Sequence, residues 1–416
     1  MKRLAAIVLS TIALTGALSA QRGAATPKAL EIYVVDTEGG KAALWVAPGS
    51  QSLLIDSGNP GPRDLERIMA AVTDARLKQI DYLLSTHYHV DHIGGMQELA
   101  KRIPIGTFID HGPTVEEPEQ VQGFQAAYAE LYGKAKHMVV KPGDKVPIPG
   151  LDWRIVTADG KVLKTPLPGG GKPNPACAGV EPKPVAGPDE NAQSVGSVIT
   201  FGQFRAIDLG DLLWNKEIEL VCPNNPVGVV DVYFVTHHGL DQSGSPALVH
   251  GVQPRVAIMQ NGTRKGAGTQ AMPTMRSSPG LEDIWQLHWS YNAGIEQNSA
   301  GVFIANVDDA ATIANVLTAP PRGGRPAGAG SGATGAPGTG VPGNAVPPQT
   351  PPSAAAPAPG AAPQGGGAAA PGGGRGAAAA AHSPAYWIKV SVQPDGTFTV
   401  SNSRNGFSKT YAKRHF

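Results

Sequence analysis

The stretch Thr86-His87-Tyr88-His89-Val90-Asp91-His92 decides the fold of this 416-residue chain. It places three imidazoles and one carboxylate within six residues. This is too dense for a hydrophobic core, because buried groups of these kinds need polar partners. A divalent metal satisfies imidazole nitrogen and carboxylate oxygen together. The run is therefore interpreted as a metal-binding segment, and Gly94 and Gly95 after it let the backbone approach the site closely.

The flanking residues place this run at the end of a strand. Residues 80–85 (Ile-Asp-Tyr-Leu-Leu-Ser) are typical of a short buried strand, and a helix is expected to start near Gly94. On a loop between the two, His87 and His89 can point to one position while Asp91 and His92 point to a neighbouring one. This arrangement favours two adjacent cations.

Strand and helix patterns alternate along the rest of the chain. Residues 31–46 and 52–55 are rich in Val, Ile, Leu and aromatic residues and are broken by Gly and Pro turns. Apolar residues then recur at helical spacing from Leu65 to Val72. The further strands expected are 195–201, 204–209, 230–236 and 255–259. This alternation predicts the α/β class.

The histidine run resembles the signature of the metallo-β-lactamase superfamily, a His-x-His-x-Asp-His loop after a strand. The resemblance implies an αββα sandwich of two mixed sheets with outer helices. It also implies further ligands downstream, each after an apolar strand. Asp211 matches the aspartate that bridges two metals, with Asp208 as its near competitor. His237-His238-Gly239 matches the last histidine motif, without indicating which histidine binds.

The resemblance implies a centre of two divalent metals. Zinc is the first expectation, and manganese or iron also suit N and O ligands without cysteine. A shared hydroxide would attack the substrate, with proton transfer by a group beside the metals. Asp91 and His238 are the candidate catalytic residues. The implied metal ligands are His87 and His89 at one position, Asp91, His92 and His237 or His238 at the other, and Asp211 between them.

Two residues are expected to support these ligands. Asp56 matches an early aspartate that orients the metal loop. The residues alone equally favour a turn aspartate before Ser57-Gly58. Asn191 is the second residue, and it occupies a place where many members of the superfamily carry another histidine. Such a histidine often lies in a Gly-His-Thr segment, and neither His111 nor His137 does. The third position at the first metal is therefore left open between His137 and Asn191.

Within the superfamily, residues 31–262 look most like the extracellular hydrolase domain of the competence protein ComEC and its stand-alone relatives. The matching segments are 87–95, 191–195, 209–211 with Glu217, and 235–239. This resemblance implies a metal-dependent hydrolase acting on a phosphodiester or a related ester. The alternatives are a lactonase or thioesterase-like hydrolase of the same fold, and a noncatalytic metal-binding secreted module.

The chain also departs from this subgroup. Leu240 stands where the subgroup usually has serine, and a later Gly-His-Pro element is missing after Asn261-Gly262. His288 is a replacement candidate, but Trp285 and Trp289 around it favour an ordinary packed segment.

The N-terminus indicates export. Lys2 and Arg3 precede an apolar stretch over residues 4–14 and a run of small residues, which predicts a cleaved signal peptide over residues 1–20. The expected location is secreted or periplasmic, with no membrane span in the mature chain. In an oxidising compartment, Cys177 and Cys222 are expected to form a disulfide.

Charge argues against tight binding of long nucleic acid. The formal charge of +1 becomes −1 once Lys2 and Arg3 are removed, whereas phosphate backbones are bound by clustered Lys and Arg. A small-molecule or phosphodiester substrate is therefore the expected partner. Seven basic residues are expected to form a scattered surface rather than a patch: Lys134, Lys136, Lys141, Lys145, Arg255, Arg264 and Lys265.

Composition divides the chain after the signal peptide. Residues 27–318 are expected to form the metallo-β-lactamase-fold domain. Residues 319–382 are so rich in Gly, Pro and Ala that they are predicted to be a disordered insertion. In residues 383–416, the segments 386–392 and 397–400 flank Asp395-Gly396 and predict a hairpin that packs on the main domain, because an isolated hairpin is marginal in water.

Overall fold

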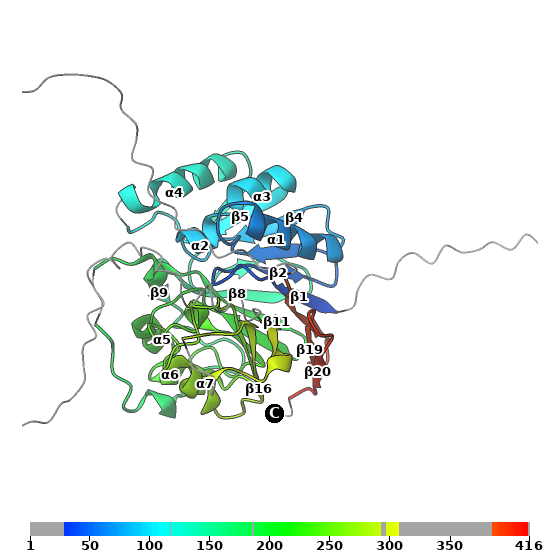
Figure 1. Ribbon diagram of the computed structural model, residues 1–416. Coiled ribbons are helices and arrows are strands. Elements are labelled where there is room, and N and C mark those ends of the chain that lie inside the picture. The colour runs from blue at the N-terminus through cyan, green and yellow to red at the C-terminus, as the bar shows by residue number, and fades with distance from the viewer. Residues whose placement is uncertain (1–28, 117, 185–186, 293–296, 308–384, 415–416) are drawn as a thin grey trace, which may run out of the picture.

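The computed structural model describes residues 29–116, 118–184, 187–292, 297–307 and 385–414. The predicted signal peptide (1–20) and the predicted insertion (319–382) lie outside the described residues. The described residues form two mixed β-sheets that pack face to face, with helices on the outer face of each sheet (Figure 1). This is the αββα arrangement expected from the sequence.

The first sheet contains β4, the strand that precedes the histidine run, as the third strand from the β6 edge. Its strands β3 to β6 run parallel, and the remaining pairs are antiparallel. Its strand order is β20 (Ser408–Tyr411), β19 (Phe398–Asn402), β18 (Ile388–Val392), β1 (Leu30–Val34), β2 (Ala43–Val46), β3 (Ser52–Ile55), β4 (Ile80–Leu84), β5 (Ile105–Asp110) and β6 (Lys136–Val139).

The second sheet contains the strands that precede the downstream motifs. Its half from β12 to β17 is parallel, and its other half is antiparallel. Its strand order is β17 (Ile304–Asn306), β16 (Asp283–His288), β15 (Val256–Met259), β14 (Val232–Phe234), β12 (Phe204–Asp208), β11 (Gly196–Phe201), β8 (Asp152–Ala158) and β7 (Lys145–Val146), with β9 (Lys161–Val162) beside β8. A separate pair joins β10 (Lys172–Pro173) to β13 (Asn224–Asn225).

Helices cover both outer faces (Figure 1). On the first sheet, Ile68 and Val72 of α1 are buried against strand residues such as Leu83, which explains the helical spacing of the apolar residues there. The helices over this sheet are α1 (Pro62–Asp74), α3 (Met96–Arg102) and α4 (Pro118–Tyr132), and those over the second are α5 (Trp214–Val221), α6 (Pro246–Val252) and α7 (Ala271–Arg276). Among the described residues lie the 3₁₀ turns η1 (Pro175–Cys177), η2 (Glu190–Gln193), η3 (Thr236–Gly239) and η5 (Gly301–Phe303).

The space between the sheets is filled by large side chains from both. Trp45 of the first sheet lies 5.1 Å from Trp153 and 5.3 Å from Phe234 of the second, measured between ring centroids. All three are buried. Burying one such side chain contributes roughly 1.5–3 kcal/mol, so this layer holds the two sheets, and the motifs at their ends, in fixed relation.

The C-terminal segment belongs to the first sheet. β18 pairs antiparallel with β1 from Leu30↔Val392 to Val34↔Ile388. β19 and β20 continue the sheet, so β20 is a third strand beyond the two segments of the predicted hairpin. Tyr411 of β20 donates a hydrogen bond of 2.6 Å to Asp283 of the second sheet.

The two cysteines form a disulfide that joins η1 to the end of α5. The Sγ atoms of Cys177 and Cys222 lie 1.99 Å apart. In the part of the chain that the structure describes, no helix is both long enough and apolar enough to cross a bilayer.

The helix expected near Gly94 is α3, which begins at Met96 with Gly95 as its N-cap. A further short helix precedes it, because the backbone N–H groups of His92 and Ile93 already bond to the carbonyl of His89. The resulting short helix is α2 (Val90–Ile93). Asp91 therefore lies in a first helical turn, where a carboxylate is favoured by the exposed N–H groups.

Candidate metal centre

The predicted ligands meet where strands of both sheets end. His87 follows β4, Asp211 follows β12 and His237 follows β14. Backbone bonds join these ends: the N–H of Val195 bonds to Thr86, and the N–H of His237 bonds to Gly210. The sheets thus bring distant sequence motifs to one edge, the usual place for a site in an α/β fold.

Asp56 organises the histidine loop. Its Oδ1 accepts the backbone N–H of Thr86 at 2.8 Å, and its Oδ2 accepts both the Thr86 hydroxyl and Nδ1 of His92 at 2.8 Å. The residue is fully buried and has a φ of 59°. A left-handed conformation is costly for aspartate, so the surrounding bonds hold a strained residue in place. Asp56 thus orients the loop rather than only forming a turn.

Hydrogen bonding fixes which nitrogen of His87 and His92 carries a lone pair. The single hydrogen of the Thr86 hydroxyl goes to Asp56, so Nδ1 of His87, 3.1 Å from that hydroxyl, must donate to it. Nδ1 of His92 likewise donates to Asp56. Both rings therefore present an unprotonated Nε2 to the site in the neutral state.

His89 is oriented by a residue that the sequence did not single out. Its Nε2 lies 3.0 Å from Oε1 of Glu116, which accepts the ring hydrogen. Nδ1 of His89 then faces Nε2 of His87 at 3.0 Å. Two lone pairs directed at each other are unfavourable unless a proton or a metal ion lies between them, so these atoms define a candidate first metal position.

A second position lies beside the first and has more donors. Nε2 of His92 and Nε2 of His238 are 3.3 Å apart, and Oδ2 of Asp211 lies 3.2 Å from each. Oδ2 of Asp91 lies 3.4 Å from each of the same nitrogens. These four donor atoms all lie within 4.8 Å of one another. Imidazole nitrogen and carboxylate oxygen in this number suit a divalent metal.

His237 and His238 differ in the acceptor that their Nδ1 hydrogen reaches, and therefore in where their Nε2 points. Nδ1 of His238 donates to the carbonyl of Gln260 at 3.0 Å, which leaves its Nε2 in the second position. Ser243 gives its hydroxyl hydrogen to Leu212 at 2.7 Å, so Nδ1 of His237 donates to Ser243 at 3.1 Å. Nε2 of His237 lies 3.6 Å from Asp211, outside the four-donor group. His238 is thus the stronger ligand candidate of the two, and His237 lies outside the four-donor group.

The electrostatic field differs between the two positions. Burial lowers the pKa of His92, but Asp211, Asp91 and Asp56 outweigh it and hold this pKa well above its ordinary value. Burial, together with His92 and His89, holds the pKa of His87 well below its ordinary value. Positive charge is therefore strongly favoured at the second position.

Two unpartnered oxygens support the metal interpretation. Oδ1 of Asp211 is buried and has no hydrogen-bond partner, although its Oδ2 faces the second position. A buried carboxylate oxygen without a donor is costly, and a carboxylate between two cations would use both oxygens. Oδ1 of Asn191 is also buried without a partner, next to Glu190, whose carboxylate accepts the N–H of Tyr88. The residues present therefore fit two metals.

The remaining candidates lie outside this cluster. His137 bonds to Asp110 at 2.6 Å, and His111 bonds to Glu190 at 3.0 Å. His288 bonds to Asp36 at 2.6 Å, so it replaces no ligand. Asp208, the competitor of Asp211, forms a buried ion pair with Lys41.

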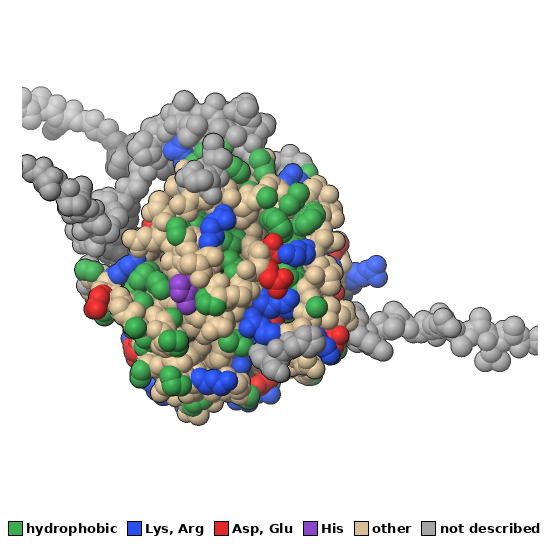
Figure 2. Space-filling view, turned by 90° about the horizontal axis from the view of Figure 1, so that it is seen from below, with side chains coloured by type: hydrophobic (Ala, Val, Ile, Leu, Met, Phe, Trp, Pro, Cys, Tyr) green, Lys and Arg blue, Asp and Glu red, His purple; other side chains and the backbone are tan. Residues whose placement is uncertain are grey.

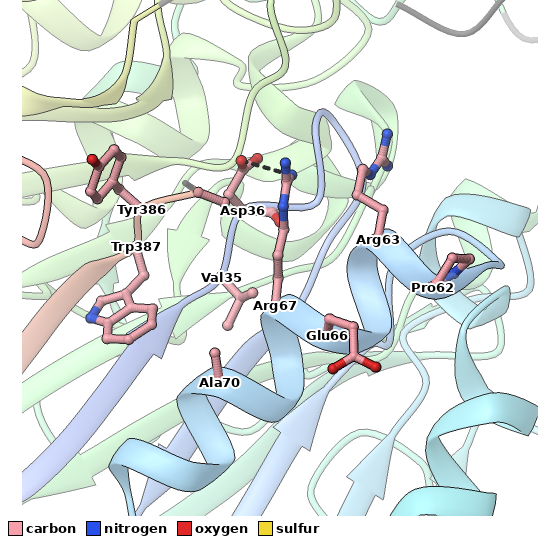
Figure 3. A pocket seen from close by; sticks show the side chains of 10 residues that line it. Val35, Asp36, Pro62, Arg63, Glu66, Arg67, Ala70, Tyr386 and Trp387 are labelled. Atoms are coloured by element: carbon pink, nitrogen blue, oxygen red, sulfur yellow. Dashed lines mark hydrogen bonds and ion pairs between the residues drawn. The ribbon is translucent and has the colours of Figure 1, made fainter. Parts of the chain in front are cut away.

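A separate cavity of about 480 Å³ lies beside α1. The aromatic rings of Tyr386 and Trp387 lie on one side, and α1 with Arg67 on the other (Figure 3). Arg67 is paired with Asp36 at 2.8 Å. None of the donor atoms of the two metal positions lines this cavity.

Sequence reasoning missed three contributors to the site: Glu116, Ser243 and Lys265. Each acts through one contact made across the fold, with His89, His237 and Asp91 respectively. Glu116 and Ser243 lie in no recognised motif. Lys265 stands three residues after Gly262 and was expected only as one of the scattered basic residues of the surface.

Comparison with known proteins agrees with this geometry. Residues 36–181 match the model of the family described as the Metallo-beta-lactamase superfamily. ComE operon protein 3 of Bacillus subtilis is 28% identical over 249 residues, which are 56% of this chain and 28% of that protein. Hydroxyacylglutathione hydrolase of Klebsiella pneumoniae is 27% identical over 122 residues, which are 29% of this chain and 39% of that protein. The chain thus spans well under half the length of either relative.

Among solved structures, Igni18, a metallo hydrolase from Ignicoccus hospitalis, is 14% identical with a TM-score of 0.36, covering 62% of this chain and 94% of that one. The family match includes the histidine run and Asp56, and the match to the Bacillus protein agrees with the ComEC-type resemblance expected from the sequence. The chain therefore contains a metallo-β-lactamase superfamily domain.

Proposed function

We propose that this protein is an exported binuclear metallohydrolase that cleaves a phosphodiester or a related ester. The observation that carries the proposal is the arrangement of four imidazoles: His87, His89, His92 and His238 each have one ring nitrogen held by an acceptor and the other turned inward. The inward nitrogens meet in two pairs, 3.0 and 3.3 Å apart. A protein that bound no metal would have little reason to keep such pairs.

The ligands divide into two groups. His87 and His89 would hold the first metal, and Asp91, His92 and His238 the second, with Asp211 between the two. Asn191 is the better candidate than His137 for completing the first group, since His137 is engaged by Asp110. When bound, the two divalent metals would supply an activated water and stabilise charge on the reacting oxygens. Zinc is the metal proposed first, with manganese or iron as alternatives.

His237 is placed to handle a proton. Its Nδ1 hydrogen is held by Ser243, and burial lowers its pKa to about 4, so Nε2 carries a lone pair at neutral pH. That atom lies 3.6 Å from Asp211, beside the cluster without being part of it. This assigns proton transfer to His237, whereas the sequence had suggested His238. Asp91 is left as a ligand.

Two observations favour a phosphodiester over a lactone or a thioester as the substrate. The Bacillus relative aligns over 249 residues, against 122 for the hydroxyacylglutathione hydrolase. The two histidines between the first motif and Asp211, His111 and His137, are both engaged by carboxylates away from the cluster. The lactonase and thioesterase alternatives would call for a further histidine ligand there.

Long nucleic acid is not favoured as the substrate. On the face seen in Figure 2, Lys and Arg side chains lie in separate groups, and the largest group includes acidic side chains. Arg255 is paired with Glu282 at 2.7 Å, and Lys145 with Asp152 at 3.2 Å. Such pairs neutralise the charge that a polyphosphate chain would need.

The first test is metal content together with turnover. Purified protein is analysed for bound metals and assayed with bis(p-nitrophenyl) phosphate, with and without added zinc or manganese. Close to two metals per chain and turnover that a chelator abolishes support the proposal. Metal without turnover on phosphodiester, ester and lactone substrates would favour the noncatalytic metal-binding module, and absence of metal would overturn the proposal.

A further inference from the structure

We propose that Lys265 binds an anionic oxygen of the substrate, so that the site selects esters with a negative charge next to the scissile bond. This inference rests on the proposed function and narrows its substrate class. Lys265 lies between β15 and α7, and its ammonium contacts Oδ2 of Asp91. Its side chain is 35% exposed, so the ammonium sits at the metal cluster while the residue remains open to solvent.

The loop that carries Lys265 is held on both sides. Its carbonyl accepts the N–H of Gly262 at 2.9 Å, which closes a tight turn. The stem of Lys265 lies against Gly39, where an added Cβ would be 3.1 Å from Cβ of the lysine. A Cβ on Gly266 would be 1.9 Å from the carbonyl oxygen of His238, so the backbones there are in direct contact. The ammonium is therefore delivered by fixed backbone rather than by a mobile surface loop.

A second lysine of the domain gives a contrast. Lys41 is 3% exposed and is matched by Asp208, which lies outside the cluster, so this pair is structural. Lys265 instead shares its carboxylate with the metal cluster, because Oδ2 of Asp91 also lies 3.4 Å from Nε2 of His92 and of His238. Asp91 therefore does not serve Lys265 alone.

Charge balance then requires an additional anion. If Oδ2 of Asp91 serves a divalent cation, the single negative charge of that group cannot also neutralise the adjacent ammonium. Lys265 would be left beside a cationic centre, which is unfavourable unless a further negative group approaches. Since the side chain is open to solvent, a substrate can supply that group. An ammonium suits a phosphate oxygen as a compact point charge with several donors.

This assignment predicts discrimination by charge. A phosphodiester carries an anionic nonbridging oxygen for Lys265, whereas a neutral carboxylic ester or lactone does not. Inorganic phosphate, which resembles the phosphodiester group, should also use the ammonium when it binds the metal-loaded protein.

The test compares Lys265→Gln and Lys265→Arg with wild type, and Arg264→Gln serves as the matched control, because Arg264 is the exposed neighbour on the same turn. The measurements are kcat and KM for bis(p-nitrophenyl) phosphate and for neutral p-nitrophenyl acetate, bound metal per chain, and phosphate affinity by calorimetry. Lys265→Gln should raise KM for the anionic ester and weaken phosphate binding about tenfold or more. Bound metal should be retained, turnover of the neutral ester should fall much less than that of the anionic ester, and Lys265→Arg should retain most of the phosphate affinity.

Equal losses on the anionic and neutral esters, or loss of metal in Lys265→Gln, would overturn the proposal, as would unchanged phosphate affinity. Unfolding of the variant is recognised by its melting temperature, and in that case Lys265→Arg decides whether the positive charge matters. If wild-type protein cleaves no ester at all, the proposed function fails. The phosphate titration still tests Lys265 independently of turnover.

Discussion

The two metal positions of this domain are built to different degrees. The second gathers four donors from three segments, and most of them are buried. The first gathers two donors from one loop, His87 and His89, and the more exposed of these depends on Glu116, which is itself partly exposed. A site whose ligands are already fixed loses less entropy on binding a metal. The comparison therefore implies that the second position is filled first and more tightly.

The largest effect is expected from replacing Asp211, because this removes the group that both metal positions share. Asp211→Ala should lose metal from both and lower turnover by more than the roughly 100-fold that loss of an orienting partner costs. Metal analysis and the phosphodiester assay measure this. Glu219→Ala, at a surface carboxylate, is the control, and two retained metals in Asp211→Ala would contradict a bridging role.

Two ligand variants distinguish the first metal position from the second. His238→Ala should lose the tightly bound metal. His89→Ala should keep one metal that resists chelator, because the four-donor group of the second position is intact in that variant. Titration of each variant with a coloured chelator counts the tight sites. If both variants lost metal equally, the two positions would be equivalent and the comparison would fail.

A smaller effect is expected from Asp56→Asn. The amide has one acceptor oxygen for three donors, so His92 is held less firmly and metal affinity at the second position should fall about 10- to 100-fold. Affinity is measured by competition with a chelator of known strength. An unchanged affinity would mean that the loop backbone alone orients His92.

The smallest effect should come from Glu116→Gln, which keeps an acceptor for His89 but removes its charge. Affinity at the first position should fall by about tenfold, with the second position unchanged. His137→Ala provides the control, since His137 bonds to Asp110 away from the cluster and should alter neither position. A change at the second position would show that the two are coupled through more than Asp211.

The fold could be predicted because its decisive features are local. The apolar strand over residues 80–85 and the helical spacing from Leu65 to Val72 each appear in one short window, and the structure contains them as β4 and α1. The two-sheet architecture followed from the resemblance. β6 and β20 were missed because each has only four residues of mixed polarity, and their neighbours in the sheet define them.

The site was predicted less completely, for a physical reason. The ligand types of His92 and Asp211 follow from motifs, but the choice between His237 and His238 depends on which acceptor each Nδ1 reaches. Ser243 and Gln260 make that choice through contacts that only the folded chain brings together. The same holds for Lys265, whose sequence neighbours gave no sign that it reaches Asp91.

The pairing of β1 with β18 has a consequence for the order of folding. Leu30 and Val392 are partners in one ladder, so an early strand of the domain gains its second neighbour only from residues near the opposite end of the chain. During synthesis from the N-terminus, β1 can pair with β2 but leaves one edge open until the last strands emerge. Such long-range closure slows folding and exposes an unpaired edge in the meantime. Chains shortened by some thirty residues at the C-terminus should therefore aggregate before any metal is bound, even though every proposed ligand is present.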